Sequence, residues 1–458
     1  MQHASHVVSR AQHLSNQRAL QLTRQILDEV VKPERAGEVG IRLWDGSLWP
    51  DETPRATTLH LKHAGALRAI FLRFLEIQSC EAYLFDDFDI EGRIENLAPF
   101  MEGLRDSSDK QTSPLRALSM MLRLPPTRES RGLYISQLRR ANRQRTARDL
   151  EGERHTQERD SAAIQRHYDV SNEFYALFLD PKMVYSGGYF KSEDDSLETA
   201  QTQKLDLVCK KLRLEAGQTL LDIGCGWGAL IVHAAKHYGV HATGVTLSPS
   251  QAAWARDVVE REGLTNQVRV LVQDYRATEG TFDAVSSIEM VEHVGAKNLA
   301  EYFGVAHRVL KDGGVFCVQA STNRKIEWKR VPTFMDRYVF PDGQLIPPWD
   351  LMREADAIGF ETRDVEDLRE HFALTLRHWL RRLEDNREAA LQHVDDVTYR
   401  VWRLYMAASG FGYTSRLLAL YQTLLVKNDS RGRNDLPLTR ADWFDSFEPQ
   451  RREGAESF

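Results

Sequence analysis

The stretch from Leu220 to Gly228 reads LLDIGCGWG, and it decides the fold. Its leucines begin a strand that ends in the acidic Asp222, and a glycine-rich turn then opens a helix near Ala229. Glycines at alternate positions of this turn take conformations that a Cβ opposes, and they let the backbone approach a bound nucleotide closely. The stretch therefore predicts a strand–turn–helix unit over which a nucleoside can lie.

The chain around this stretch alternates short apolar runs with helical segments. The runs with the length of strands are TLLDI, HATGVT, VRVLV, FDAVSSI and VFCVQ, and a helix is expected from Pro249 to Glu262. This alternation is typical of a parallel sheet with helices between its strands. We predict an α/β fold with a doubly wound, Rossmann-like domain, and a helix-rich segment from Gln319 to about Lys427.

The glycine spacing distinguishes between two classes of nucleotide cofactor. A dinucleotide site would show G-x-G-x-x-G and an acidic residue at the end of the second strand. Here the spacing is G-x-G-x-G, the second strand ends in Thr246, Leu247 and Ser248, and Asp274 with Tyr275 follows the third. This order favours S-adenosylmethionine over NAD, although a purely structural turn remains the alternative.

The flanking regions suggest three further segments. Residues 1–124 mix helical and strand-like pieces and are expected to form a smaller α+β domain. Residues 125–160 are a charged linker or arm, in which five arginines lie between Arg139 and Arg148. This arm is either attracted to an anionic phospholipid surface or simply a solvated, charged helix. The Rossmann-like, S-adenosylmethionine-binding domain is expected over 161–428, and residues 429–458 are expected to form a polar tail that lies on the surface or is mobile.

Composition limits the partners and the location. The net charge of −6 does not favour nucleic acid, because phosphate binding needs clustered positive charge. The chain contains no run of about 18 apolar residues, and its first residues lack the apolar stretch of a secretory signal. We therefore expect a cytoplasmic protein. The four cysteines are far apart and have no histidines at zinc-ligand spacing, so no metal site is predicted.

Several longer motifs resemble one enzyme family. They are HYDVSNEFYALFLDPKMVYSGGYF from His167, LETAQTQKLDLVCKKL from Leu197, GVTLSPSQ, QDYR, EMVEHVG and DRYVFPDG, in addition to the glycine turn. This ordered set resembles the cyclopropane fatty acid synthase and mycolic acid methyltransferase family from about Ala162 to Lys427. The segment before Leu124 is also similar to the family's N-terminal domain.

The resemblance implies a reaction and a setting. S-adenosylmethionine would give a methyl(ene) group to the cis double bond of an unsaturated fatty acyl chain of a membrane phospholipid, which yields a cyclopropane fatty acid. A helical cover would hold the acyl chain, and HYDVSN would close over the cofactor as a lid. The protein would act as a homodimer, peripherally associated with the inner membrane face.

The resemblance also assigns site residues. At the reaction centre it implies Glu292, with Glu289 and Gln319 beside it, and it suggests Tyr338, Phe340 and Trp379 as rings that stabilise a cation. The residues implied in cofactor binding are Tyr185, Ser186, Asp222, Gly224, Gly226, Trp227, Gly228, Thr246, Leu247, Ser248, Gln251, Asp274 and Tyr275. No catalytic role is assigned to His167 or His293.

The chain departs from the family at its proton acceptor. The family holds a bicarbonate ion with a cysteine, a glutamate, a histidine and a tyrosine, but Gly187, Gln319 and Phe372 stand where three of these ligands are expected. A buried anion without partners is costly, so bound bicarbonate is doubtful. Our hypothesis is that Glu289, where the commoner family sequence has glycine, takes the proton. The alternative is that Glu289 only makes a structural hydrogen bond.

Three other functions stay open. Methylene-branching relatives share the glutamate before the methionine and the glutamine of the fifth strand, so a methylene- or methyl-branched product is possible. A small-molecule N-methyltransferase is a second alternative, because such enzymes resemble the same catalytic domain. Loss of three bicarbonate ligands keeps a third alternative, a non-catalytic lipid- or cofactor-binding relative.

Overall fold

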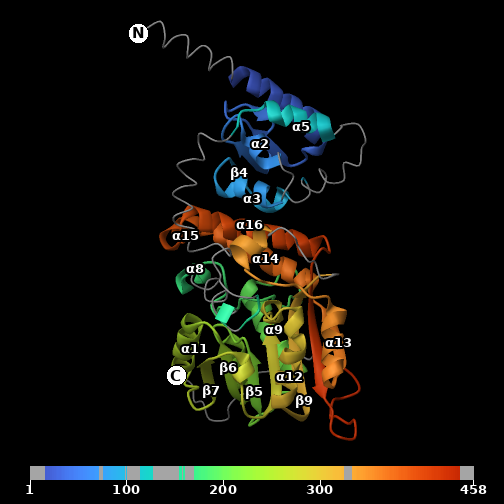
Figure 1. The fold of residues 1–458 in the computed structure, drawn as a ribbon. Coiled ribbons are helices and arrows are strands. Elements are labelled where there is room, and N and C mark those ends of the chain that lie inside the picture. Colours follow the sequence, from blue (N-terminus) through green and yellow to red (C-terminus); the bar gives the residue numbers. More distant parts are fainter. Residues whose placement is uncertain are drawn as a thin grey trace. The chain divides into compact units, whose positions relative to one another are not determined.

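The computed structural model describes residues 16–71, 76–97, 100, 114–126, 154–156, 158–159, 170–323 and 333–443. The chain divides into two compact units (Figure 1). The first comprises Met1–Asp149, Lys329–Val339 and Asp395–Phe411, and the second comprises Leu150–Trp328, Phe340–Val394 and Gly412–Phe458. Two segments inside the range expected for the methyltransferase domain thus belong to the first unit.

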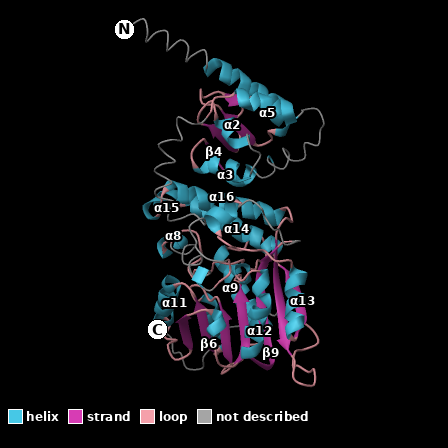
Figure 2. Ribbon diagram, viewed as in Figure 1, coloured by secondary structure: helices cyan, strands magenta, loops and turns pink. Residues whose placement is uncertain are grey.

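The second unit is built on a seven-stranded sheet in the order β10-β11-β9-β8-β5-β6-β7 (Figure 2). Neighbouring strands from β9 to β7 run parallel, whereas β11 is antiparallel to both β9 and β10. The strands are β5 (Thr219–Ile223), β6 (His241–Thr246), β7 (Val268–Val272), β8 (Phe282–Ile288), β9 (Leu310–Thr322), β10 (Phe360–Asp367) and β11 (Ala419–Lys427).

The predicted α/β fold is confirmed, and its five predicted strands are β5 to β9. The expectation of a helix-rich segment after Gln319 missed β10 and β11. Strand β10 lies at the edge of the sheet and buries only Phe360 and Asp364, so it lacks the apolar run of a central strand.

Helices cover both faces of this sheet. Adjacent residues of β5 point to opposite faces: Leu220 lies in one apolar core and Leu221 in the other, and both are fully buried. The first core includes side chains of α9 (Leu197–Lys211), α10 (Ala229–Tyr238) and α11 (Pro249–Arg261). The second includes α12 (Leu299–Val309) and α13 (Pro348–Ile358). Further helices are α8 (Asn172–Ala176), α14 (Arg369–Asp385) and α15 (Arg387–His393).

The first unit contains a four-stranded mixed sheet in the order β2-β1-β3-β4. Its strands are β1 (Val39–Arg42), β2 (Leu48–Trp49), β3 (Thr57–Leu61) and β4 (Phe88–Gly92), and its helices include α2 (Ala66–Phe71), α3 (Glu76–Leu84) and α5 (Pro114–Arg123). Helix α16 (Asp396–Thr414) contributes its residues up to Phe411.

Buried arginines explain why this part of α16 belongs to the first unit. Arg400 donates to the Tyr83 carbonyl at 3.0 Å and forms ion pairs with Asp86 and Asp89. Arg403 donates to the carbonyls of Ile90 and Gly92. These bonds satisfy backbone carbonyls that α3 and β4 leave at their ends.

The polar tail is not wholly at the surface. Trp443, in the short helical turn Ala441–Trp443, is buried in the same core as α9, and its ring centroid lies 5.3 Å from the Lys211 ammonium. The expectation of a purely polar surface tail is therefore wrong at this residue, because an indole ring buries a large apolar area.

Two predictions fall outside the described residues: the arginine-rich arm between 139 and 148, and the start of the HYDVSN lid at His167. Among the described residues, no helix combines the length and the apolar character needed to cross a membrane.

Candidate active site

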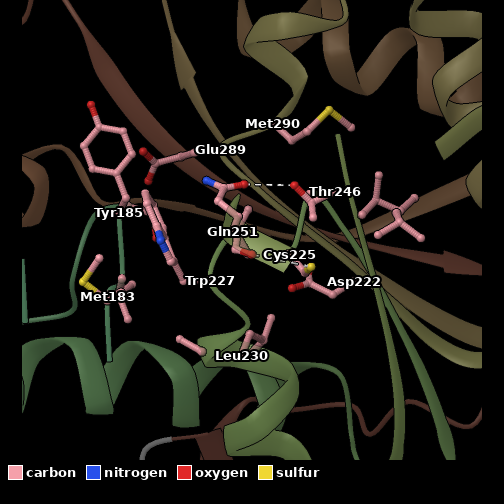
Figure 3. Close-up of a pocket in the computed structure, with 18 of the residues that line it drawn as sticks. Met183, Tyr185, Asp222, Cys225, Trp227, Leu230, Thr246, Gln251, Glu289 and Met290 are labelled. Carbon is pink, nitrogen blue, oxygen red and sulfur yellow. Dashed lines mark hydrogen bonds between the residues drawn. The ribbon is translucent and has the colours of Figure 1, made fainter. Parts of the chain in front are cut away.

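A pocket lies at the carboxyl ends of β5, β6 and β8, within the second unit (Figure 3). This edge of a parallel sheet is where ligands bind in open α/β folds. The pocket is lined by Met183, Val184, Tyr185, Ser186, Lys204, Leu205, Asp222, Ile223, Gly224, Cys225, Gly226, Trp227, Ala229, Leu230, Val245, Thr246, Leu247, Gln251, Gln273, Tyr275, Ile288, Glu289, Met290 and His293.

The backbone of the glycine turn beside this pocket requires glycine at two positions. Gly224 has a φ of +82°, and a Cβ built on it would lie 2.7 Å from Cγ of Met290. Gly228 has a φ of +87°, and its Cβ would lie 2.8 Å from the Ala255 side chain of α11. Gly224 therefore keeps the pocket open beside Met290, whereas Gly228 allows α10 to pack against α11.

Most of the residues predicted to bind the cofactor line this one pocket, but three do not. Gly228 precedes α10, and Ser248 caps α11 by accepting a hydrogen bond from the Gln251 backbone at 3.3 Å. Asp274 forms an ion pair with Arg276 at 2.8 Å. These three residues lie in the loops that follow β5, β6 and β7. Their direct role in cofactor binding remains a prediction.

Hydrogen bonds orient the polar side chains around the pocket. Thr246 Oγ1 donates to Gln251 Oε1 at 2.9 Å, and this bond is drawn in Figure 3. Trp227 Nε1 donates to Asn172 Oδ1 at 2.8 Å, which ties the glycine turn to the end of the HYDVSN motif. Burial raises the pKa of Asp222 to about 6, although its carboxylate accepts a bond from Ser286 Oγ.

Glu289 has an unusual backbone conformation. Its φ is +53°, in the left-handed region that favours glycine and costs a side chain about 1 kcal/mol. Its Oε1 atom accepts hydrogen bonds from the Gly187 backbone and from Gln319 Nε2, both at 2.8 Å. Gln319 Oε1 in turn accepts from Gln422 Nε2 at 2.9 Å, which orients the amide. Strained residues of this kind concentrate at functional sites.

Glu292 lies behind Glu289 and does not line the pocket. Its Oε1 atom accepts a hydrogen bond from the Ser321 backbone at 2.6 Å, while the buried Oε2 atom has no hydrogen-bond partner among the described residues. Burial, followed by the nearby charge of Glu289, raises the pKa of Glu292 to about 8. Burial also raises the pKa of Glu289, but the bonds from Gly187 and Gln319 oppose this shift. Glu292 therefore holds its proton more firmly than Glu289.

The residues that replace the family's bicarbonate ligands surround the Glu289 carboxylate. A Cβ added to Gly187 would lie 2.7 Å from Leu420, 3.4 Å from the Phe372 ring and 3.6 Å from Glu289 Oε1. A cysteine at this position would therefore collide with Leu420. Gln319 donates to the carboxylate itself. The side chain of Glu289 thus receives the hydrogen bonds that an anion at this place would need.

The aromatic residues suggested for a cation have different positions. The ring of Trp379 stacks on Tyr185, with centroids 5.2 Å apart, and Tyr185 lines the pocket. Phe340 lies 6.0 Å from the ring of His293. Tyr338 is in the first unit, where its hydroxyl donates to Glu81, and it does not line the pocket. The structure therefore supports Trp379 and Phe340 as neighbours of the site.

Sequence reasoning missed Lys204. This lysine of α9 lines the pocket, is 2% exposed, and donates from Nζ to Ser186 Oγ at 2.8 Å. A signal was present, since Lys204 follows Leu197, Ala200 and Gln201 at helical spacing on the buried face of α9. A lysine on an apolar helix face is rarely placed there without a charged or polar partner.

The glycine turn and the sheet order belong to a class I S-adenosylmethionine-dependent methyltransferase. The family model described as mycolic acid cyclopropane synthetase matches residues 155–423. The chain belongs to this family of lipid-modifying methyltransferases.

Three relatives show the extent of the similarity. A "Probable fatty acid methyltransferase" of Pseudomonas putida is 42% identical over 63% of this chain and 75% of its own length. The "Probable fatty acid methyltransferase Rv3720" of Mycobacterium tuberculosis is 43% identical over 65% of this chain and 70% of its own length. The structure of mycolic acid cyclopropane synthase CmaA1, complexed with SAH and CTAB, has a TM-score of 0.55 and 32% identity, and the match covers 58% of this chain and 97% of that one.

S-adenosylmethionine is therefore the methyl donor, and the pocket fits it. The turn at Gly224 and Gly226 has positive φ and leaves its backbone open to a nucleoside. Thr246, Gln251 and Tyr275 supply polar and aromatic groups around the same space.

We predict that Gly224→Ala lowers affinity for S-adenosylmethionine by about tenfold or more, because the added methyl group strains the backbone and meets Met290. Gly217→Ala is the matched control: Gly217 has a similar φ of +86°, has no atom within 4 Å of the added Cβ, and does not line the pocket. Calorimetric titration of both folded variants tests this, and equal affinities would contradict the assignment of the pocket.

Proposed function

We propose that this protein transfers a methyl(ene) group from S-adenosylmethionine to the cis double bond of an unsaturated acyl chain of a membrane phospholipid. The observation that carries the proposal is the Glu289 carboxylate, which lines the cofactor pocket in a strained conformation. Family membership supports a lipid acceptor, because the similar relatives are described as fatty acid methyltransferases.

The proposed reaction needs one proton acceptor. Bound S-adenosylmethionine would supply an electrophilic methyl group. The double bond would form a carbon–carbon bond to this methyl group as the methyl–sulfur bond breaks, so that S-adenosylhomocysteine leaves and the acyl chain carries the positive charge. Glu289 accepts the proton that the cation then loses, and the released electron pair completes the product. Glu292 holds its own proton more firmly and acts as the neutral neighbour of the pair.

The surroundings of Glu289 suit a carbocation. Trp379 and Tyr185 present stacked rings near the pocket, and aromatic faces attract cations. Phe372 and Leu420 lie against Gly187 and add apolar surface that excludes water. A methyltransferase for small amines would not need such a shelter, and a non-catalytic relative would not need a strained carboxylate.

A cyclopropane ring is the product expected from the family resemblance, and a methylene branch, which another enzyme would reduce to a methyl branch, is a second candidate. The hydrogen-bonded pair of Glu289 and Gln319 favours the second, because methylene-branching relatives share these two residue types.

The proposal includes a setting. The enzyme acts at the inner face of the membrane as a peripheral homodimer, with the first unit as the part that contacts lipid or the second subunit. The arginines between 139 and 148 support attraction to anionic phospholipid.

Expression in a bacterium that makes unsaturated phospholipids but lacks cyclopropane synthesis tests the function. Fatty acid methyl esters analysed by mass spectrometry are expected to gain the mass of one methylene unit, and fragmentation separates a ring from a branch. An unchanged fatty acid profile, despite good expression and measured cofactor binding, would contradict the proposal.

Glu289→Gln is expected to reduce turnover by about 100-fold or more while cofactor affinity stays near that of the wild type, because the amide cannot accept the proton. Glu289→Gly is expected to recover part of the turnover when acetate or bicarbonate is added, since it vacates the place of the carboxylate. Glu301→Gln, an exposed position paired with Arg276, is the control and should remain active. Full turnover by Glu289→Gln would show that another group takes the proton.

A further inference from the structure

Lys204 has no place in the reaction described so far, although it is almost fully buried in the wall of the cofactor pocket. An ammonium group in such surroundings is costly unless opposite charges compensate for it. Its hydrogen bond to Ser186 Oγ is to a neutral partner and supplies no negative charge. The compensation must therefore come from carboxylates near the pocket.

A short backbone segment connects Lys204 to the proposed proton acceptor. Lys204 Nζ donates to the hydroxyl of Ser186 at 2.8 Å, and the carbonyl of Ser186 accepts from Gln201 Nε2 at 2.7 Å. The next residue, Gly187, donates its backbone N–H to Glu289 Oε1 at 2.8 Å. Helix α9 thus fixes both the ammonium and the backbone donor relative to the Glu289 carboxylate.

The Lys204 ammonium and the Glu289 carboxylate each affect the pKa of the other. Burial lowers the pKa of Lys204 to about 8, and the charge that most strongly opposes this shift is that of Glu289. Burial raises the pKa of Glu289, and the hydrogen bonds from Gly187 and Gln319, followed by the charge of Lys204, oppose this rise. The charge of Glu289 in turn raises the pKa of Glu292. The other titratable groups that interact with the Lys204 ammonium come from several elements and are Asp180, Asp222, Cys317 and His233.

We propose that Lys204 is a positioning residue for the reaction: its ammonium keeps the Glu289 carboxylate ionised inside the pocket, so that Glu289 can accept a proton at neutral pH. This inference rests on the proposed function and extends it from the base to the charge that maintains the base. Without Lys204, one of the influences that oppose the effect of burial is lost, so the balance shifts toward the neutral acid, which cannot take the proton.

The pH dependence of turnover tests the inference. The assay uses vesicles of dioleoyl phosphatidylglycerol with saturating methyl-labelled S-adenosylmethionine, and it records kcat against pH. Since Glu289 must be ionised, activity falls as pH decreases through its pKa. In Lys204→Met this acid limb is expected to move upward by roughly one pH unit or more, with turnover recovering at high pH. Lys204→Arg, which keeps the cation, is expected to leave the limb close to its wild-type position.

Three variants separate charge from structure. Lys204→Gln keeps a donor toward Ser186 but has no charge, so it should move the limb as Lys204→Met does, and it provides the same test if Lys204→Met does not fold. Lys211→Met removes another buried lysine of α9, one that pairs with Asp364 and Glu366 outside the pocket, and should leave the limb unmoved. The double variant Lys204→Met with Glu289→Gln should be no slower than Glu289→Gln alone.

Several results would overturn the inference. Turnover of Lys204→Met that falls equally at every pH would show a merely structural role. A raised KM for S-adenosylmethionine with an unmoved limb would show that the ammonium binds the cofactor's carboxylate instead. A wild-type enzyme that methylates no acyl chain would overturn the proposed function as well, whereas an active wild type with an unmoved limb in Lys204→Met overturns the inference alone.

Discussion

Glu289 and Glu292 are two buried carboxylates three residues apart in the sequence. It is costly for both to be ionised at the same time. The structure distinguishes them by their hydrogen bonds. Glu289 receives two donors on one oxygen and lines the pocket, while Glu292 has one oxygen without a partner among the described residues. In the proposed mechanism, these environments make Glu289 the base and Glu292 its protonated neighbour. The rest of the proposed chemistry depends on this difference.

A fixed side chain replaces a mobile anion in this account. A bound bicarbonate must be held by several donors and can leave, whereas a carboxylate on β8's carboxyl end is covalently attached and always present. The cost is the left-handed backbone at Glu289, about 1 kcal/mol, which the pair of hydrogen bonds offsets. Gly187 is part of the same arrangement, because its backbone N–H donates to the carboxylate and a Cβ there would lie 2.7 Å from the Leu420 side chain. Two of the three departures from the family pattern, Gly187 and Gln319, thus donate hydrogen bonds to the same Glu289 carboxylate.

Much of this could be predicted from sequence, because it depended on local patterns. The glycine turn and the apolar runs predicted β5 to β9, and the predicted strand ends put Asp222 and Thr246 at the same sheet edge. The role of these two residues in cofactor binding came from the family resemblance. Edge strand β10 was missed because its side chains are mostly half-exposed and show no apolar run. Part of α16 belongs to the first unit because Arg400 and Arg403 contact residues that are more than 300 positions away in the sequence. Such long-range contacts leave no local signal.

The site was predicted less completely than the fold. Glu289 was recognised as a departure from the family, but its backbone conformation and its bonds to Gly187 and Gln319 require coordinates. Lys204 was not predicted, although the helical periodicity of α9 places it on the same face as Leu197 and Ala200. The aromatic candidates were separated only by structure, since Trp379 stacks beside the pocket and Tyr338 belongs to the other unit.

The most direct test of the central claim is the turnover of the wild-type enzyme on unsaturated phospholipid vesicles in carbon dioxide-free buffer, with and without added bicarbonate. If Glu289 is the proton acceptor, turnover is the same in both conditions. A rate that falls when bicarbonate is removed, and returns when it is restored, would contradict the replacement of the anion by this side chain.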